Sequence, residues 1–265
     1  MPRPLRRALA LVLIALAVAA AAACGGGDGG GEDLSKGLTA RELLDRSAEE
    51  AAAAESFRIA VEATGGVDLA ERSEVPGGDL LAGDLDVSGE GPVQPPDRAS
   101  LDLQLRLAGP TLQGNVTRVG DEVFIGVLGQ DFRVDLPPEQ VALLDLSALY
   151  PTLVGWAVDP EESGRGEIDG TPTVTVTSDL DPERALTDLA PLLQIDGVSA
   201  EQARAAVSEG SLEASIGTED LLPRRVRLVL RADGSGLDAG VGPIAIDLTA
   251  DLTAYDEPVD IQAPQ

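Results

Sequence analysis

Histidine is absent from the 265-residue chain, and the only cysteine is Cys24. Without histidine the chain lacks the commonest general base and the commonest ligand of transition metals. One cysteine excludes an intrachain disulfide and a metal site built from several thiolates. The single lysine, Lys36, lies beside a glycine-rich segment, so we expect no serine–lysine dyad in the folded domain. We therefore predict a protein that is not an enzyme and has no metal site and no cofactor.

Aromatic residues are also scarce, at 2% of the chain, although 43% of the residues are apolar. The interior must therefore consist mainly of Leu, Val, Ile and Ala. The length suits one large domain or two small ones, and we favour one. The aliphatic bias has two interpretations, which are GC-rich coding and selection for a large apolar cavity.

Positively charged residues are scarce as well. The chain has 19 Lys and Arg but 46 Asp and Glu, which gives a net charge of −27. A surface this acidic repels phosphate backbones, so we expect no nucleic-acid partner. The one visible basic cluster contains Arg224, Arg225, Arg227 and Arg231. Its arginines either meet anionic headgroups or balance nearby carboxylates.

Only one long apolar run exists, from residue 8 to residue 23, and it follows Arg3, Arg6 and Arg7. The run is shorter than the roughly 20 residues that a spanning helix needs, so residues 1–23 are predicted to be a signal peptide. The small residues from Ala21 to Cys24 resemble a bacterial lipobox. We therefore expect a lipid-anchored Cys24 and a location on the outer face of the cell membrane. The alternatives are an uncleaved anchor helix and cleavage by an ordinary signal peptidase.

Residues 24–37 are predicted to form the lipidated end and a flexible tether, because 25–31 are all glycine except for Asp28. The folded domain is expected to occupy residues 38–265. At its start, Thr39 and Glu42 have the spacing of a capping box, which predicts a helix to about residue 55. Further helices are expected from Pro137 to Trp156, from Pro182 onward and from Ser199 to Gly210.

Alternation of apolar and polar residues predicts many strands between these helices. They are expected at 56–62, 85–88, 101–107, 112–119, 123–127, 132–136, 173–178, 211–216, 225–230 and 244–252. We interpret 159–166 as a polar loop, Pro92 as a chain break and Pro151 as a helix kink. Strands and helices do not alternate regularly, so the sequence predicts an α+β fold with one large antiparallel sheet rather than a doubly wound fold.

Such a sheet has one aliphatic face, which only a few short helices are available to cover. Incomplete cover would leave an apolar cavity. The residues expected to line it are Leu101, Leu103, Leu105, Leu107, Ile244, Ile246 and Leu248. The alternative for each of them is a place in a filled core.

Several stretches of the chain resemble one known family. They are ELLDRS at 42–47 followed by SFR at 56–58, GDEVF at 120–124, DGTPT at 169–173, LPRRV at 222–226 and YDEPVDI at 255–261. In this order the chain resembles the actinobacterial LppX/LprAFG lipoprotein family, whose fold is similar to the LolA and LolB lipoprotein carriers. The resemblance implies a half-open antiparallel barrel with helices on its concave face, and a cavity for the acyl chains of lipids or glycolipids.

From these observations we expect a noncatalytic cell-envelope lipoprotein that binds or carries a lipid or glycolipid. An envelope transporter or acceptor protein is a further partner that this function admits. The alternative function is a scaffold lipoprotein of the same fold, with a filled core and no ligand.

Overall fold

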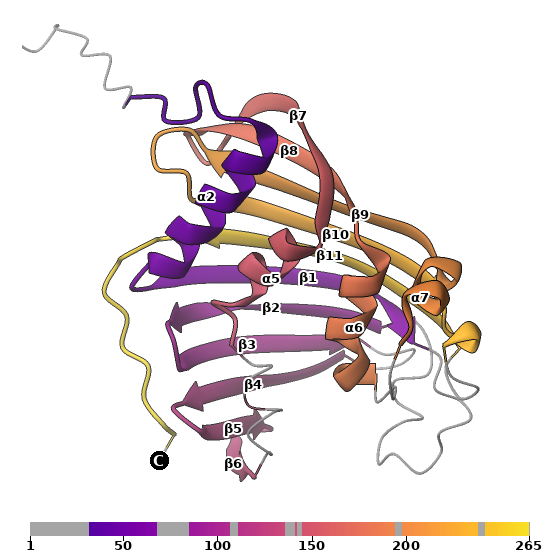
Figure 1. Cartoon of the computed structure of the whole chain (residues 1–265). Helices are drawn as coiled ribbons and strands as arrows, with labels where there is room; N and C mark the ends of the chain where they lie inside the picture. The colour runs from indigo at the N-terminus through magenta and orange to yellow at the C-terminus, as the bar shows by residue number, and fades with distance from the viewer. Residues whose placement is uncertain are drawn as a thin grey trace, which may run out of the picture. The chain divides into compact units, whose positions relative to one another are not determined.

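The computed structural model describes residues 32–67, 85–106, 111–135, 141, 145–193, 198–237 and 242–264. The chain divides into two compact units, Met1–Asp33 and Leu34–Gln265. All described helices and strands belong to the second unit (Figure 1). The predicted signal peptide, Cys24 and Leu107 lie outside the described residues.

Eleven antiparallel strands form one sheet, in the order β6-β5-β4-β3-β2-β1-β11-β10-β9-β8-β7. The strands are β1 (Phe57–Val67), β2 (Leu85–Gln94), β3 (Arg98–Arg106), β4 (Thr111–Val119), β5 (Glu122–Val127), β6 (Gln130–Val134), β7 (Ala157–Ile168), β8 (Thr171–Leu180), β9 (Val207–Gly217), β10 (Pro223–Asp233) and β11 (Pro243–Thr253). The sheet is not closed, because β6 and β7 at its two edges do not pair with each other. The predicted α+β fold with a large curved antiparallel sheet is confirmed.

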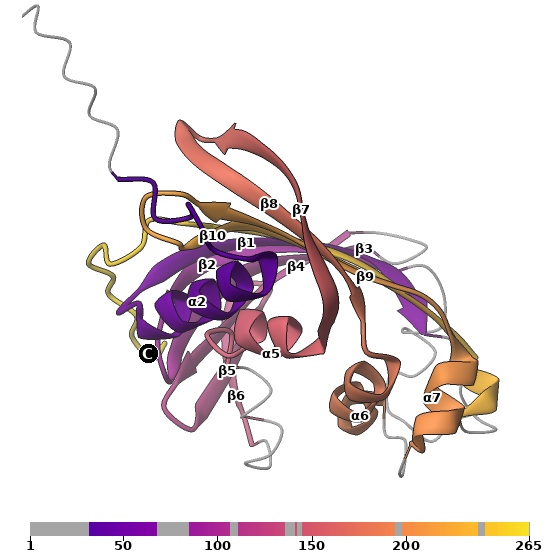
Figure 2. The ribbon, with the colours of Figure 1, turned by 45° about the horizontal axis from the view of Figure 1, so that its top comes forward.

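In the described part of the chain, four helices cover one face of this sheet, which curves around them (Figures 1 and 2). They are α2 (Ala40–Ala53), α5 (Leu149–Trp156), α6 (Pro182–Leu193) and α7 (Ala200–Ala206), and a short 3₁₀ turn, η1 (Gly234–Gly236), follows β10. The face that carries the helices is called the inner face from here on. The expected position of the helices on the concave side is therefore confirmed.

The helices begin where the sequence places their caps. In α2, the Thr39 backbone N–H donates to Glu42 Oε2 at 2.8 Å, and the Glu42 backbone N–H donates to Thr39 Oγ1 at 3.3 Å. The same reciprocal pair links Ser199 and Gln202 at the start of α7. Asp181 accepts backbone N–H groups of the first turn of α6. These side chains satisfy donors that a helix start otherwise leaves without a partner.

Two clusters of buried apolar side chains fill the space between helices and sheet. The larger cluster joins α2 and α5 to strands on both sides of β1, and its fully buried members include Leu43, Leu153 and Val174. The smaller cluster joins α6 and α7 to the ends of β10 and β11. It contains Leu186, Ala190, Ala203, Ala206, Ala232, Leu237 and Ile244. Both cores are aliphatic in the main, as the composition predicts.

The predicted loop at 159–166 is wrong, because these residues belong to the edge strand β7. Ala157 at the start of the strand is buried, but the residues from Glu161 to Glu167 are all exposed, so this part of β7 has no buried face and shows no alternation of apolar and polar residues. Its pairing with β8 is interrupted by two irregularities, between Val158 and Glu161 and between Glu162 and Gly164. A charged, irregular strand at a sheet edge resists pairing with other chains.

Two predictions about proline are also wrong. Pro92 lies inside β2, where it is in register with Arg58 of β1, while the ladder between β2 and β3 is interrupted at Gly91 and Pro92. The missing N–H of proline is therefore accommodated without ending the strand. Pro151 lies in the first turn of α5, which begins at Leu149 after turn residues 146–148. A first-turn N–H has no partner within the helix, so proline does not kink α5.

Candidate functional site

Strand register brings the predicted lining residues to one face of the sheet. Leu105 pairs with Val87, Val87 is in register with Ala63, and Ala63 pairs with Leu248. These residues form one cross-strand row, and the neighbouring row contains Leu103. Because side chains alternate between faces along a strand, the β3 leucines and the β11 residues Ile244, Ile246 and Leu248 all lie on the inner face.

The well-buried part of the inner face lies on β10 and β11. Ile244 is 1% exposed and belongs to the smaller core cluster, while Ile246 and Leu248 are partly buried against the clusters. Ile244 thus lies in a filled core, which is the alternative that the sequence left open for it. Ile246 and Leu248 lie where the filled region ends.

Cover decreases from β3 towards β6. Leu101, Leu103 and Leu105 are half-buried, and only Leu101 packs against the larger core cluster. On β4, β5 and β6, Val116 is half-buried and Val123 is buried, whereas four large apolar side chains of the inner face are exposed: Leu112 is 50% exposed, Ile125 37%, Val127 42% and Phe132 52%. The open apolar face is the name used below for eight inner-face residues of β3–β6, which are Leu101, Leu103, Leu105, Leu112, Val116, Ile125, Val127 and Phe132. The alternating leucines predicted the β3 part of this face, whereas its β4–β6 part was not predicted, although those strands also alternate.

On the outer face of β10 and β11, arginines are engaged with carboxylates. Arg225 donates to both oxygens of Asp251, at 2.6 and 2.9 Å, and Arg227 donates to both oxygens of Asp247, at 3.2 and 2.9 Å. The hydrogen bonds from Arg227 lower the pKa of Asp247 below its ordinary range. These pairs favour the interpretation that the basic cluster balances nearby carboxylates rather than meeting anionic headgroups.

The other two arginines of the cluster also act within the fold. Arg231 donates to the backbone carbonyl of Ile246 at 2.6 Å. Arg224 pairs with Asp220, and its guanidinium lies 5.3 Å from the ring centroid of Tyr255. A guanidinium at this distance over an aromatic ring makes a cation–π contact.

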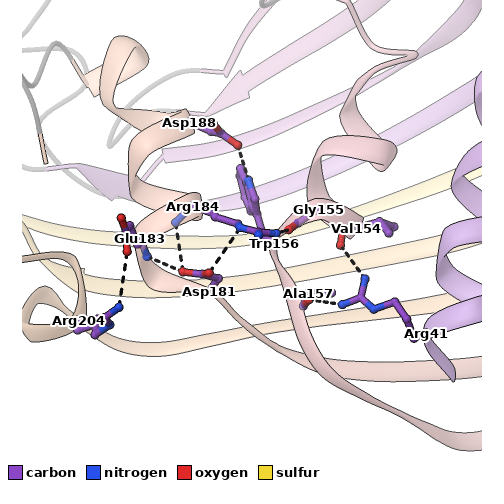
Figure 3. Close-up of polar contacts among 10 residues, drawn as sticks. All are labelled: Arg41, Val154, Gly155, Trp156, Ala157, Asp181, Glu183, Arg184, Asp188 and Arg204. Atoms are coloured by element: carbon purple, nitrogen blue, oxygen red, sulfur yellow. Dashed lines mark hydrogen bonds and ion pairs between the residues drawn. The ribbon is translucent and has the colours of Figure 1, made fainter. Parts of the chain in front are cut away.

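A second polar arrangement, which the sequence did not reveal, holds α5 between α2 and α6 (Figure 3). Arg41 of α2 donates to the carbonyls of Val154 and Ala157, and Arg184 of α6 donates to the carbonyl of Gly155 at 2.9 Å. The last carbonyls of a helix have no partner within it, and cations there also interact favourably with the helix dipole. Two guanidiniums from different elements therefore stabilise the end of α5.

Trp156 completes this junction, because its Nε1–H donates to Asp188 Oδ2 at 2.7 Å while its ring is 4% exposed (Figure 3). A pocket of about 690 Å³ lies beside it and is lined by Thr152, Gly155, Trp156, Asp181, Glu183, Arg184, Thr187 and Asp188. The charged groups there already pair among themselves, since Asp181 contacts Arg184 and Glu183 contacts Arg204. The junction therefore fixes α5 in place.

No helix in the described ranges is both long enough and apolar enough to cross a membrane. Known proteins resemble the chain in structure rather than in sequence. No family model matches it, and no curated protein matches it in sequence.

Two mycobacterial proteins of known structure are similar over most of the chain. The Mycobacterium tuberculosis lipoprotein LppX has 15% identity and a TM-score of 0.50, and the match covers 84% of this chain and 98% of LppX. LprF from Mycobacterium bovis has 17% identity and a TM-score of 0.51, with 85% and 96% covered. A LolA superfamily protein from Nitrosomonas europaea reaches only 0.30, which establishes no common fold. The chain therefore has the fold of LppX and LprF, which confirms the resemblance at the level of fold.

Proposed function

We propose that this chain is a noncatalytic, lipid-anchored protein of the cell envelope that binds acyl chains of a lipid or glycolipid on its open apolar face. One observation carries the proposal, which is the continuous row of apolar side chains from the filled core to exposed positions on β4–β6. The fold shared with the lipoprotein LppX supports it.

Burial of apolar surface supplies the driving force. Contiguous apolar patches of this kind are uncommon on monomeric proteins and mark binding surfaces. Each Å² of apolar surface removed from water stabilises a complex by about 25 cal/mol, and each buried methylene by about 0.8 kcal/mol. An acyl chain laid across several strands therefore binds without any catalytic or ionic group.

The anchor belongs to the same proposal. Lipid on Cys24 would keep the domain within reach of the bilayer from which it takes its ligand. Two or three acyl chains on one cysteine hold a protein stably, whereas a single chain is marginal. A Cys24→Ala chain should then appear in the soluble fraction, and a variant that stays membrane-bound would contradict the anchor.

Native mass spectrometry tests the ligand. We expect the protein purified gently from a bacterial envelope to carry copurified lipid masses, which disappear after delipidation and return when lipid is added. A protein that carries no lipid mass and takes up none, while its circular dichroism shows a folded β-rich chain, would refute lipid binding.

A scaffold function is the second candidate, and the filled clusters beneath α2, α5, α6 and α7 favour it. In that case the open apolar face would bind an envelope protein instead of a lipid. Crosslinking in intact cells should then recover one partner protein through residues on β4–β6, and the purified chain should be free of lipid.

A further inference from the structure

The exposed large apolar side chains of the domain gather in one region. Six are found among the described residues, and five of them belong to β4, β5, β6 or the turn between β5 and β6. They are Leu112, Ile125, Val127, Leu128 and Phe132. Ile125 pairs directly with Phe132, and Val127 pairs with Gly114 of β4 and Gln130 of β6. These five residues are called the apolar edge below.

Leu128 at the turn is the most unusual of them, because it combines strain with exposure. Its φ is 55°, a left-handed conformation that favours glycine or asparagine, and its side chain is 95% exposed. Leu221 has a similar φ of 56°, but its side chain is 5% exposed and packs in the larger core cluster. Burial explains a strained leucine at 221. Neither packing nor turn chemistry explains one at 128, which points to a contact outside the chain.

Charge around the apolar edge indicates the kind of surface it meets. Arg133 of β6 contacts the carboxylates of Glu122 and Asp135, so its positive charge is compensated within the hairpin. Asp131 adds further negative charge beside Phe132, and the whole chain carries −27. Such a surface repels anionic headgroups. The same surface is compatible with a zwitterionic bilayer, because headgroups without net charge do not repel it when apolar side chains insert.

We propose that the apolar edge, with Leu128 at its tip, inserts into the boundary between headgroups and acyl chains of a zwitterionic lipid bilayer. The apolar edge is continuous with the open apolar face, so an acyl chain leaving the bilayer there meets apolar side chains from Phe132 through Leu101. The inference rests on the proposed lipid-binding function and adds the place where the domain meets its lipid source.

The anchor is compatible with this contact. Nine residues lie between Cys24 and Leu34, which makes ten steps along the chain, and the Leu34 N–H donates to the Thr218 carbonyl beside β9 at 2.7 Å. Extended, these residues span at most about 35 Å. Eight strand spacings of about 4.8 Å separate β9 from β6, which is about 38 Å along the sheet. A domain tethered at Leu34 can therefore tilt until the apolar edge touches the bilayer.

A fluorescent probe on the full chain tests the contact. The chain is produced with its leader in a bacterium that lipidates exported proteins, purified with its anchor and reconstituted into phosphatidylcholine vesicles. Leu128→Cys, labelled with an environment-sensitive nitrobenzoxadiazole dye, should emit at shorter wavelength than in detergent-free buffer and should be quenched by doxyl-labelled lipid. Asp169→Cys is the matched control, because Asp169 is an exposed turn residue with a φ of 49° in the β7–β8 hairpin.

The proposal requires quenching at 128 and none at 169. Equal quenching at both positions would show mere proximity to the bilayer and would overturn the proposal. So would quenching at 128 that occurs only when anionic phosphatidylglycerol is added. The proposal would also be overturned if the emission shift at 128 grew with protein concentration and the doxyl-labelled lipid did not quench the dye. That result would indicate self-association. The lipid content of the same preparation is measured separately, so docking and ligand binding succeed or fail independently.

A substitution without a reporter at the tip gives a second test. Leu128→Asn suits the left-handed turn, so its Tm should equal or exceed that of the parent chain. A dye at Gln130→Cys should nevertheless lose its lipid quenching in the Leu128→Asn background. The same change at the buried position, Leu221→Asn, should lower the Tm. Unchanged quenching at 130 in Leu128→Asn would overturn the proposal.

Discussion

A charge placed on the open apolar face should weaken lipid binding strongly while the fold survives. Leu103 of β3 is half-buried, and its strand neighbours in register are Gly89 and Gly114. The Leu103 side chain leans over Gly89, where an added Cβ would lie 2.6 Å from Leu103 Cδ2. Because both of its neighbours in the cross-strand row are glycines without side chains, Leu103 projects above them on the inner face. A ligand that crosses β3 there must contact it. The change is Leu103→Glu.

The expected loss follows from the spacing of the strands. A ligand chain that crosses one strand, a step of about 4.8 Å, contacts Leu103 with about four methylene groups, which amounts to about 3 kcal/mol. This loss corresponds to an affinity about 100-fold weaker. A carboxylate that loses water beneath the ligand adds to the cost. The exposed neighbour Gln104 lies on the outer face, so Gln104→Glu adds the same charge and should leave affinity unchanged.

Titration of the delipidated chain with a fluorescent fatty acid measures both affinities, and circular dichroism checks that both variants are folded. The reasoning would be refuted by two outcomes. One is a Leu103→Glu chain that is folded and binds as tightly as the parent. The other is a Gln104→Glu chain that loses affinity to the same extent, since the effect would then come from net charge and not from the inner face.

Three further predictions concern the scaffold. Thr39→Ala should lower the unfolding free energy by about 1 kcal/mol in urea titration because α2 loses its cap; an unchanged midpoint would contradict this. Asp188→Ala should lower it by about 1 kcal/mol, since Trp156 Nε1–H loses its acceptor, whereas Asp188→Asn should recover most of the loss. Because Arg227 lowers the pKa of Asp247, this carboxylate stabilises the fold above the ordinary Asp pKa, and stability falls as the pH drops below about 4. Asp247→Asn should flatten that decline in acid denaturation curves.

Local features of the fold were predictable from the sequence because their physics is local. The capping box of Thr39 and Glu42 lies within four residues, and the alternation in 101–107 directly shows which side chains share a face. The α+β class follows from the order of such elements. Strand β7 was missed because an exposed edge strand has no buried face, so its residues show no period.

Features that depend on distant contacts were not predictable. Arg41 and the Val154 carbonyl are 113 residues apart, and nothing in the sequence near Arg41 indicates that it binds the end of α5. Cover of the apolar face is likewise a tertiary property. Ile244 and Leu103 show the same alternating pattern, yet one is fully buried and the other is half-buried. The alternating pattern identified the side chains that share the inner face. Only the tertiary packing determined which part of that face is exposed.

The two edges of the sheet limit self-assembly by different means. Strand β7 presents Pro160, several charges and two irregularities, which hinder a second chain from extending the ladder there. Strand β6 is only five residues long and carries Asp131 and Arg133, and a short, charged edge strand offers a second chain few backbone groups to pair with. The sheet therefore resists growth into filaments at both of its described edges, although its eleven strands are never closed into a barrel.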